Sequence, residues 1–159
     1  MIKRVLLFAT VLFFCFHLTG HIYEYLVLVT NWKSGEVADV TRYVDFIRIG
    51  KPADFFAIAQ FGCLLSSLIA FIATFREKGK VRLFAGFTLF ISVVVMAGTI
   101  LIFFPINQYM GDPSGYDPVE LKAKVTTWVN FEYPRIIIIA IGLATSIAAL
   151  EFFGRNDRA

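Results

Sequence analysis

The chain has 159 residues, of which 58% are hydrophobic and 16% aromatic, and its mean hydropathy is +0.72. A soluble domain contains roughly 45–50% apolar residues, so this composition excludes an ordinary soluble protein and indicates an integral membrane protein. The formal net charge is only +3 and no basic cluster lies on a soluble face, so we expect no nucleic-acid partner.

Four apolar runs reach the length of about 18 residues that a helix needs to cross the hydrocarbon core of a bilayer. They predict membrane spans at residues 5–29, 53–75, 82–104 and 133–153. We therefore predict an all-α fold, in which the chain, 1–159, forms a single integral membrane four-helix bundle surrounded by the lipid bilayer. The first run follows two basic residues, as a signal peptide does, but it is too long and lacks a small-residue cleavage motif, so we expect a retained span.

Basic residues predict the orientation of the spans, because cytoplasmic loops carry an excess of Lys and Arg. The short loop between the second and third spans is basic, whereas the other connections balance basic with acidic residues. Its basic residues are Arg76, Lys78, Lys80 and Arg82. Both termini should then lie in the cytoplasm, and we expect the protein in a bacterial inner membrane.

The first span carries three ionisable side chains, His17, His21 and Glu24, inside an otherwise apolar segment. Steps of four and three residues place them on one helix face over two turns. Ionisable groups at bilayer depth cost free energy unless they face the bundle interior and find partners, so they are functional candidates. We expect all three to face the interior, in the outer half of the bundle.

Apolar residues between the first and second spans recur at spacings of three and four, which predicts a short amphipathic helix on the outer membrane surface. These residues are Val37, Val40, Val44 and Ile47. Ser34 is a candidate cap for the start of this helix, and Gly50 is a candidate for its end. The pattern fits a lid and a passive connector equally well.

The second and third spans add polar side chains to the same half. Gln60 lies on a seam with Cys63, and its amide must be satisfied in hydrocarbon, so it is a candidate pocket residue. Pro105 is expected to end the third helix and to bring Asn107 to the depth of Glu24, although a simple helix stop explains the same residues. The two cysteines of the chain form no redox motif, so we expect packed free thiols.

A helical extension precedes the fourth span. Asp117 offers an N-cap and Pro118 a first helical residue, so a helix should start near Pro118 and continue into the span, with a kink at Pro134. Trp128 and Glu132 share the inner face of this helix and are candidate pocket residues.

Arg135 follows Glu132 by three residues, where the fourth span enters the membrane. Its guanidinium either turns inward toward an acid or extends outward to the lipid headgroups. Small residues continue its helix face along the span, which favours the inward orientation.

Three interpretations fit the polar side chains that meet in the outer half. The first is a transition-metal site formed by His17, His21 and Glu24, since His and acidic residues on facing helices bind metals in bundle cores. The second is a metal-free acid–base or ligand-binding site, and the third is a hydrogen-bonded network that only holds the helices together. We do not expect a haem held between the two histidines, because residues on successive turns of one helix cannot take opposite axial positions.

In the acid–base interpretation, His21 or His17 is the general base, Glu24 orients it, and Asn107 with Arg135 stabilises negative charge on a substrate oxygen. The candidate catalytic residues are therefore His21, Glu24, Asn107 and Arg135. The candidate residues of the substrate pocket are Gln60, Trp128 and Glu132.

Two short motifs give a resemblance to a known family. Pro105-x-Asn107 lies at the outer end of the third span, and Trp128-x-Asn130 precedes Arg135. With the four-span layout, these motifs resemble a family of small bacterial membrane proteins of unknown function that includes fungal anthrone oxygenases. The stretch 20–29 looks like a subgroup of that family. The resemblance implies oxidation of a polycyclic, membrane-soluble phenol, with no established cofactor.

A second resemblance covers fewer residues. Asn130-x-Glu132-Tyr133, followed by proline, is similar to a motif of the membrane-associated proteins of eicosanoid and glutathione metabolism, which are also four-span. That family carries the motif on its second span, whereas here it opens the fourth.

Taken together, the sequence predicts a membrane-embedded protein with an outward-facing polar pocket for a lipophilic small molecule. An oxidoreductase or oxygenase-like enzyme is one form of this prediction. The alternative is a non-enzymatic binding, transport or accessory protein whose buried polar network is structural.

Overall fold

A computed structural model describes residues 1–77 and 79–156, so Lys78, one of the basic residues used to predict orientation, lies outside the described residues. The predicted all-α fold is confirmed: the described residues form helices and turns and contain no strand. Within them, four helical stretches are long and apolar enough to cross a membrane, namely Ile2–Asn31, Pro52–Thr74, Lys80–Met110 and Pro118–Arg155. The protein is therefore a helical membrane protein.

The first stretch is not a uniform α-helix. Helix α1 covers Ile2–Tyr23 and is followed by a π-helical turn, Glu24–Leu28, and a 3₁₀ turn, Val29–Asn31. A π turn takes one more residue per hydrogen-bonded ring than an α-helix, so it changes the face on which the following side chains lie. Glu24 is the first residue of that turn.

The amphipathic helix between the first two stretches is present as α2, Val37–Phe46, but both predicted boundaries are wrong. The helix starts after Glu36 and ends at Ile47, before Gly50. Ser34 does not cap it, because Gly35 adopts the left-handed conformation, with φ +70°, and separates Ser34 from the helix.

The proline in the third stretch does not end the helix, which corrects the prediction for Pro105. Helix α4, Lys80–Gly98, passes through a second π turn, Thr99–Phe103, into α5, Phe104–Met110. Proline has no backbone N–H to donate within the helix. The π turn before Pro105 accommodates this missing hydrogen bond, so the chain stays helical beyond it.

The last stretch starts where the sequence predicted. Helix α6 runs from Pro118 to Asn156, and the Asp117 carboxylate accepts hydrogen bonds from the backbone N–H groups of Val119 at 2.9 Å and Glu120 at 2.8 Å. The predicted extension and the fourth span are therefore one helix. Pro134 lies inside it and does not end it.

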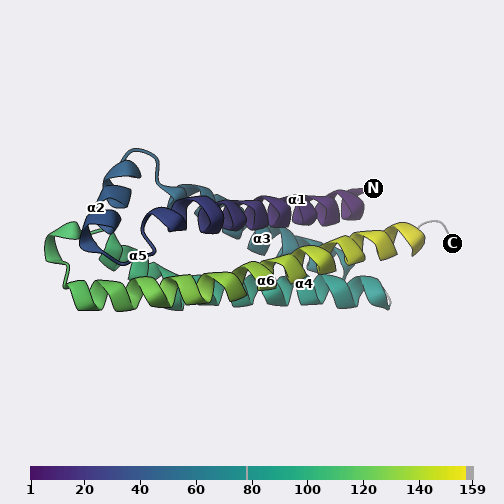
Figure 1. Ribbon diagram of the computed structural model, residues 1–159. Helices are drawn as coiled ribbons and strands as arrows, with labels where there is room; N and C mark the ends of the chain where they lie inside the picture. Colours follow the sequence, from purple (N-terminus) through teal and green to yellow (C-terminus); the bar gives the residue numbers. More distant parts are fainter. Residues whose placement is uncertain (78, 157–159) are drawn as a thin grey trace.

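Four long helices pack side by side, with α1 and α4 each lying against both α3, Pro52–Thr74, and α6. Figure 1 shows α2 and α5 at one end of the bundle and both chain termini at the other. We call these the α2 end and the terminal end. Large apolar side chains such as Phe8, Phe61 and Phe90 are exposed on the outside of the bundle, as expected for a surface that faces lipid.

Candidate functional site

Five ionisable side chains meet between α1 and α6 in the half of the bundle nearest the α2 end, and we call them the polar cluster. Its members, with their exposed fractions, are His17 (1%), His21 (2%), Glu24 (7%), Glu132 (0%) and Arg135 (8%). The predicted inward orientation of the stripe on the first span is therefore confirmed. Arg135 also turns inward and does not extend to the headgroups.

Glu132 is the central residue of the polar cluster. Its Oε1 lies 2.8 Å from His21 Nδ1, and its Oε2 accepts a hydrogen bond from Arg135 Nη2. The side chain that orients His21 is thus Glu132, which comes from α6, and not the predicted Glu24. Because the pair is separated by 111 residues in sequence, it ties the first helix directly to the last.

The histidines extend the polar cluster toward the middle of the bundle. His21 Nε2 lies 3.1 Å from His17 Nε2, and His17 Nδ1 lies 3.8 Å from Cys63 Sγ. Both cysteines are free thiols, as predicted, and Cys63 is buried. The sequence did not single out Cys63 as a partner of His17, although it placed Cys63 on an inward seam.

Glu24 occupies a different position from the other carboxylate. Its Oε2 lies 3.6 Å from His21 Nδ1, beyond hydrogen-bond distance. His21 Nδ1 therefore faces two carboxylates, yet one ring nitrogen carries at most one hydrogen. The polar cluster thus combines two carboxylates and two imidazoles with one guanidinium.

Aromatic rings enclose the polar cluster. The Phe56 ring stacks on His21 with centroids 4.4 Å apart, and the Arg135 guanidinium carbon lies 3.4 Å from the Phe103 ring centroid and 5.6 Å from that of Trp128. Such cation–π contacts stabilise a guanidinium that has left water. Phe103 ends the second π turn and Glu24 starts the first, and π turns are frequent at functional sites.

Three buried donors have no hydrogen-bond partner among the described residues. They are Arg135 Nε, Gln60 Nε2 and Trp32 Nε1. The other end of the Gln60 amide is satisfied, since Oε1 accepts a hydrogen bond from Thr99 at 3.0 Å. A buried donor without an acceptor costs about 1–3 kcal/mol, so each of these groups calls for an explanation.

Asn107 is absent from the polar cluster. Its Oδ1 accepts a hydrogen bond from the indole N–H of Trp128 at 2.9 Å. Trp128 packs edge-on against Phe103 and against Trp32, with centroids 5.5 Å and 4.9 Å apart. Asn107 therefore fixes the aromatic wall, and its predicted catalytic role stays a prediction.

Helix α2 packs over the α2 end of the polar cluster. Its Val40 is fully buried, and its Tyr43 ring lies 5.5 Å from that of Trp32. Burial, and after it the carboxylate of Glu24, raises the pKa of the Tyr43 hydroxyl. Helix α2 therefore packs against the aromatic side chains at the α2 end, and its role as a lid stays a prediction.

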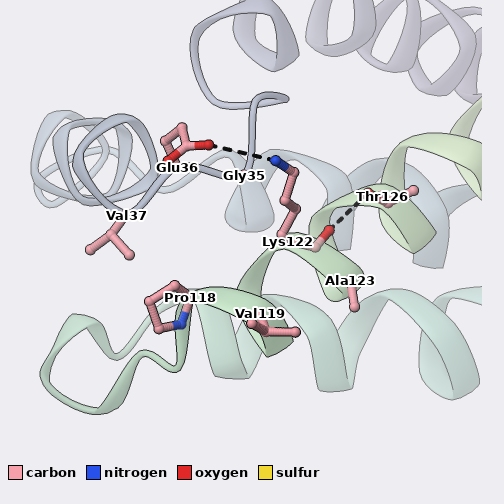
Figure 2. A pocket seen from close by; sticks show the side chains of 8 residues that line it. All are labelled: Gly35, Glu36, Val37, Pro118, Val119, Lys122, Ala123 and Thr126. Atoms are coloured by element: carbon pink, nitrogen blue, oxygen red, sulfur yellow. Dashed lines mark hydrogen bonds and ion pairs between the residues drawn. The ribbon is translucent and has the colours of Figure 1, made fainter.

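Two hollows lie away from the polar cluster. One of about 390 Å³ opens between the segment Gly35–Val37 and the first turns of α6, and Figure 2 shows Lys122 reaching across it to Glu36. A second, of about 10 Å³, lies nearer the terminal end, beside buried hydroxyl groups such as those of Thr10 and Ser67. The predicted pocket at Gln60, Trp128 and Glu132 stays a prediction. All three side chains are buried, and their partners differ: Gln60 accepts a hydrogen bond from Thr99, Trp128 donates one to Asn107, and Glu132 pairs with His21.

Metal-ligand geometry selects a different trio from the predicted one. His21, Glu24 and Glu132 each offer one ligand atom, and the three atoms lie within 4.8 Å of one another. His17 is outside this set, because its Nε2 faces Nε2 of His21 instead of the carboxylates. Glu132 therefore replaces His17 in any candidate metal site.

No family model, curated protein or solved structure matches the chain. The function is accordingly argued from the polar cluster and its surroundings. Their chemistry combines a carboxylate–imidazole pair, a second carboxylate without a hydrogen-bond donor among the described residues, a guanidinium stacked on aromatic rings, and buried donors that lack acceptors. Such an arrangement can hold a cation and can donate hydrogen bonds to an oxygen atom.

Proposed function

We propose that the protein binds a lipophilic small molecule that carries hydrogen-bond-accepting oxygen atoms, such as an aromatic ketone or quinone. The binding site would lie among α1, α3, α4 and α6 in the half of the bundle nearest the α2 end. The observation that carries the proposal is the pair of buried, unpartnered donors Arg135 Nε and Gln60 Nε2.

The chemistry of the ligand follows from these donors. Both offer hydrogen, so the ligand must offer acceptor atoms, and a carbonyl or phenolate oxygen would satisfy each of them. Phe103 and Trp128 give the site aromatic faces on which a planar ring can stack, and both already pack near the guanidinium. Pockets for small molecules commonly combine apolar walls with a few polar groups in this way.

The proposal includes an orientation. Positive charges near the terminal end favour a cytoplasmic position for both termini, and the α2 end and the polar cluster would then face outward across a bacterial inner membrane. Helix α2 would then lie at the outer surface and act as a lid, since Tyr43 and Val40 close that end. A lipophilic ligand would enter beside α2 from the outer leaflet.

Two forms of the proposal differ in what happens after binding. In the enzymatic form, an oxygenase-like oxidoreductase, His21 and Arg135 take the predicted catalytic roles and dioxygen is the oxidant. In the non-enzymatic form, the protein binds, transports or presents the molecule. The pairing of His21 with Glu132 also holds α1 against α6, so it supports the non-enzymatic form as strongly as the enzymatic form.

Quenching of tryptophan fluorescence tests the proposal directly, because the chain has only two tryptophans: Trp128 lies near the Arg135 guanidinium, and Trp32 packs against Trp128. We expect a naphthoquinone to quench the purified protein saturably. Gln60→Leu and Arg135→Lys should each weaken binding at least about tenfold, since each removes an unpartnered donor. Arg155→Lys at the exposed terminal end is the matched control and should bind as the wild type does.

The proposal fails if the wild type shows no saturable quenching. It also fails if Gln60→Leu binds the naphthoquinone as tightly as the wild type. Gln60→Leu decides the matter even if Arg135→Lys folds poorly, because the Gln60 side chain belongs to no ion pair.

A further inference from the structure

We infer that the polar cluster binds one divalent transition-metal ion through His21 Nδ1 and one carboxylate oxygen from each of Glu24 and Glu132. The inference rests on the proposed function only for the role of the ion, which would stand beside the bound small molecule. The binding of the ion itself follows from the geometry and charge of these three residues.

The distances suit a shared ion. Atoms that ligate one ion at about 2.0–2.2 Å stand roughly 3–4 Å from one another. His21 Nδ1 lies 2.8 Å from Glu132 Oε1 and 3.6 Å from Glu24 Oε2, and all three ligand atoms fall within 4.8 Å. Small rotations of the carboxylates would bring all three onto one centre.

A purely structural network does not explain why the Glu24 carboxylate lies beside His21. The Glu24 side chain is 9% exposed, and among the described residues its carboxylate accepts no hydrogen bond. Because His21 Nδ1 can donate a hydrogen to only one of the two carboxylates, and Glu132 is the nearer one, Glu24 has no hydrogen-bond donor among the described residues. A cation placed on this side of the ring would serve both carboxylates.

The groups behind the ligands are placed as metal sites require. A ligating imidazole usually donates its other N–H to a neighbouring acceptor, and His21 Nε2 lies 3.1 Å from His17 Nε2. His17 would then turn its own N–H, on Nδ1, toward Cys63 Sγ, 3.8 Å away. Arg135 holds the second oxygen of Glu132, so that Oε1 stays free for the ion.

The ligand set identifies the class of ion. One imidazole nitrogen and two carboxylate oxygens suit Mn²⁺, Fe²⁺, Co²⁺ or Zn²⁺ better than ions that prefer thiolate ligands. Three protein ligands leave at least one coordination position open, as in catalytic metal sites. An oxygen atom of the bound small molecule could take that position, which links the ion to the proposed function.

Titration with Co²⁺ tests the inference on the full chain in detergent after treatment with a chelator. We expect one Co²⁺ per chain, visible absorption bands of a low-symmetry site, and displacement by Zn²⁺. Glu24→Gln and His21→Gln should each weaken Co²⁺ binding at least about 100-fold, and His17→Phe should weaken it about 10–100-fold. Glu151→Gln is the control, because Glu151 is exposed and pairs with Arg155 far from the polar cluster.

The outcomes separate the two proposals. If the wild type binds no stoichiometric Co²⁺ while naphthoquinone quenching still depends on Gln60, the metal site is wrong and the proposed function stands. If Co²⁺ binds as expected but the naphthoquinone does not, the metal site stands and the proposed ligand is wrong. Co²⁺ binding that is unchanged by Glu24→Gln overturns the inference, and that isosteric variant keeps the test valid if His21→Gln fails to fold.

Discussion

The two halves of the bundle bury polar side chains in different ways. In the half nearest the terminal end, buried hydroxyl groups donate to backbone carbonyls three or four residues earlier in their own helix. Thr10, Thr74 and Ser146 all do so. In the half nearest the α2 end, five ionisable side chains are buried, they pair across helices, and three buried donors have no partner among the described residues.

This difference shows which buried polar groups point to function. A hydroxyl that donates to a carbonyl of its own helix already has an acceptor and needs no partner from another helix, so it is compatible with simple packing. A buried charge has no such local solution, because it needs partners from other helices or a bound cation. The unpaired donors are therefore the reason why we propose the α2 half as the binding region.

The largest effect should come from breaking the buried ion pair. Arg135→Gln leaves Glu132 without its cation and should lower the free energy of unfolding by about 3–5 kcal/mol. The exposed pair between Arg155 and Glu151 gives the matched control, and Arg155→Gln should cost no more than about 1 kcal/mol. Thermal unfolding in detergent measures both, and an unchanged midpoint for Arg135→Gln would contradict the account of the polar cluster.

A substitution at a close contact between helices, in the middle of the bundle where the two halves meet, should have the next largest effect on stability. A Cβ at Gly142 would strike the buried ring of Phe14 and would also meet Ile91 at 2.9 Å, whereas a Cβ at Gly98 meets nothing within 4 Å. Gly142→Ala should therefore cost about 1–3 kcal/mol. Gly98→Ala should stabilise by up to about 1 kcal/mol. Equal unfolding midpoints for the two variants would show that the packing of α1 against α6 is not this tight.

A smaller effect should separate satisfied from unsatisfied polar groups. Thr74→Val removes a buried hydroxyl that donates within its own helix and should cost about 1 kcal/mol. Gln60→Leu removes a buried amide whose Nε2 has no partner among the described residues, so it should be nearly neutral for stability, within about 0.5 kcal/mol. Urea unfolding in detergent resolves the difference, and a larger loss for Gln60→Leu would reverse the proposed distinction.

The orientation of the two halves carries no stability effect and is tested by labelling. A cysteine at Ser114 should react with an impermeant thiol reagent in intact cells, because the α2 end is proposed to face outward. A cysteine at Lys80 should react only after the cells are opened. The reverse pattern would place the polar cluster on the cytoplasmic side.

Hydropathy and helical period predicted much of this structure. Long apolar runs impose helices in lipid, because the backbone must satisfy its own hydrogen bonds there. The spacing of His17, His21 and Glu24 likewise placed them on the inner face. The start of α6 could also be predicted, since Asp117 and Pro118 form a strong local signal for the start of a helix.

What the sequence could not show depends on contacts between distant segments. The partner of His21 is Glu132, and only the packing of α1 against α6 brings them together. The π turns have no local sequence signature, so neither the position of Glu24 nor the continuation of the helix past Pro105 was predictable. Asn107 was placed at the right end of its span, but its bond to Trp128 depends on the approach of α6.

Nitrogen-15 NMR of histidine-labelled protein tests the central claim, that the α2 half is a binding region, most directly. The chain contains only two histidines and both belong to the polar cluster, so every histidine signal reports on the site. On addition of Zn²⁺, the account predicts that His21 Nδ1 loses its hydrogen to metal coordination and that the hydrogen of His17 moves to Nδ1. A naphthoquinone should shift the same signals without that exchange of hydrogen. Histidine spectra that neither Zn²⁺ nor the naphthoquinone changes would contradict the claim and leave the polar cluster a structural network.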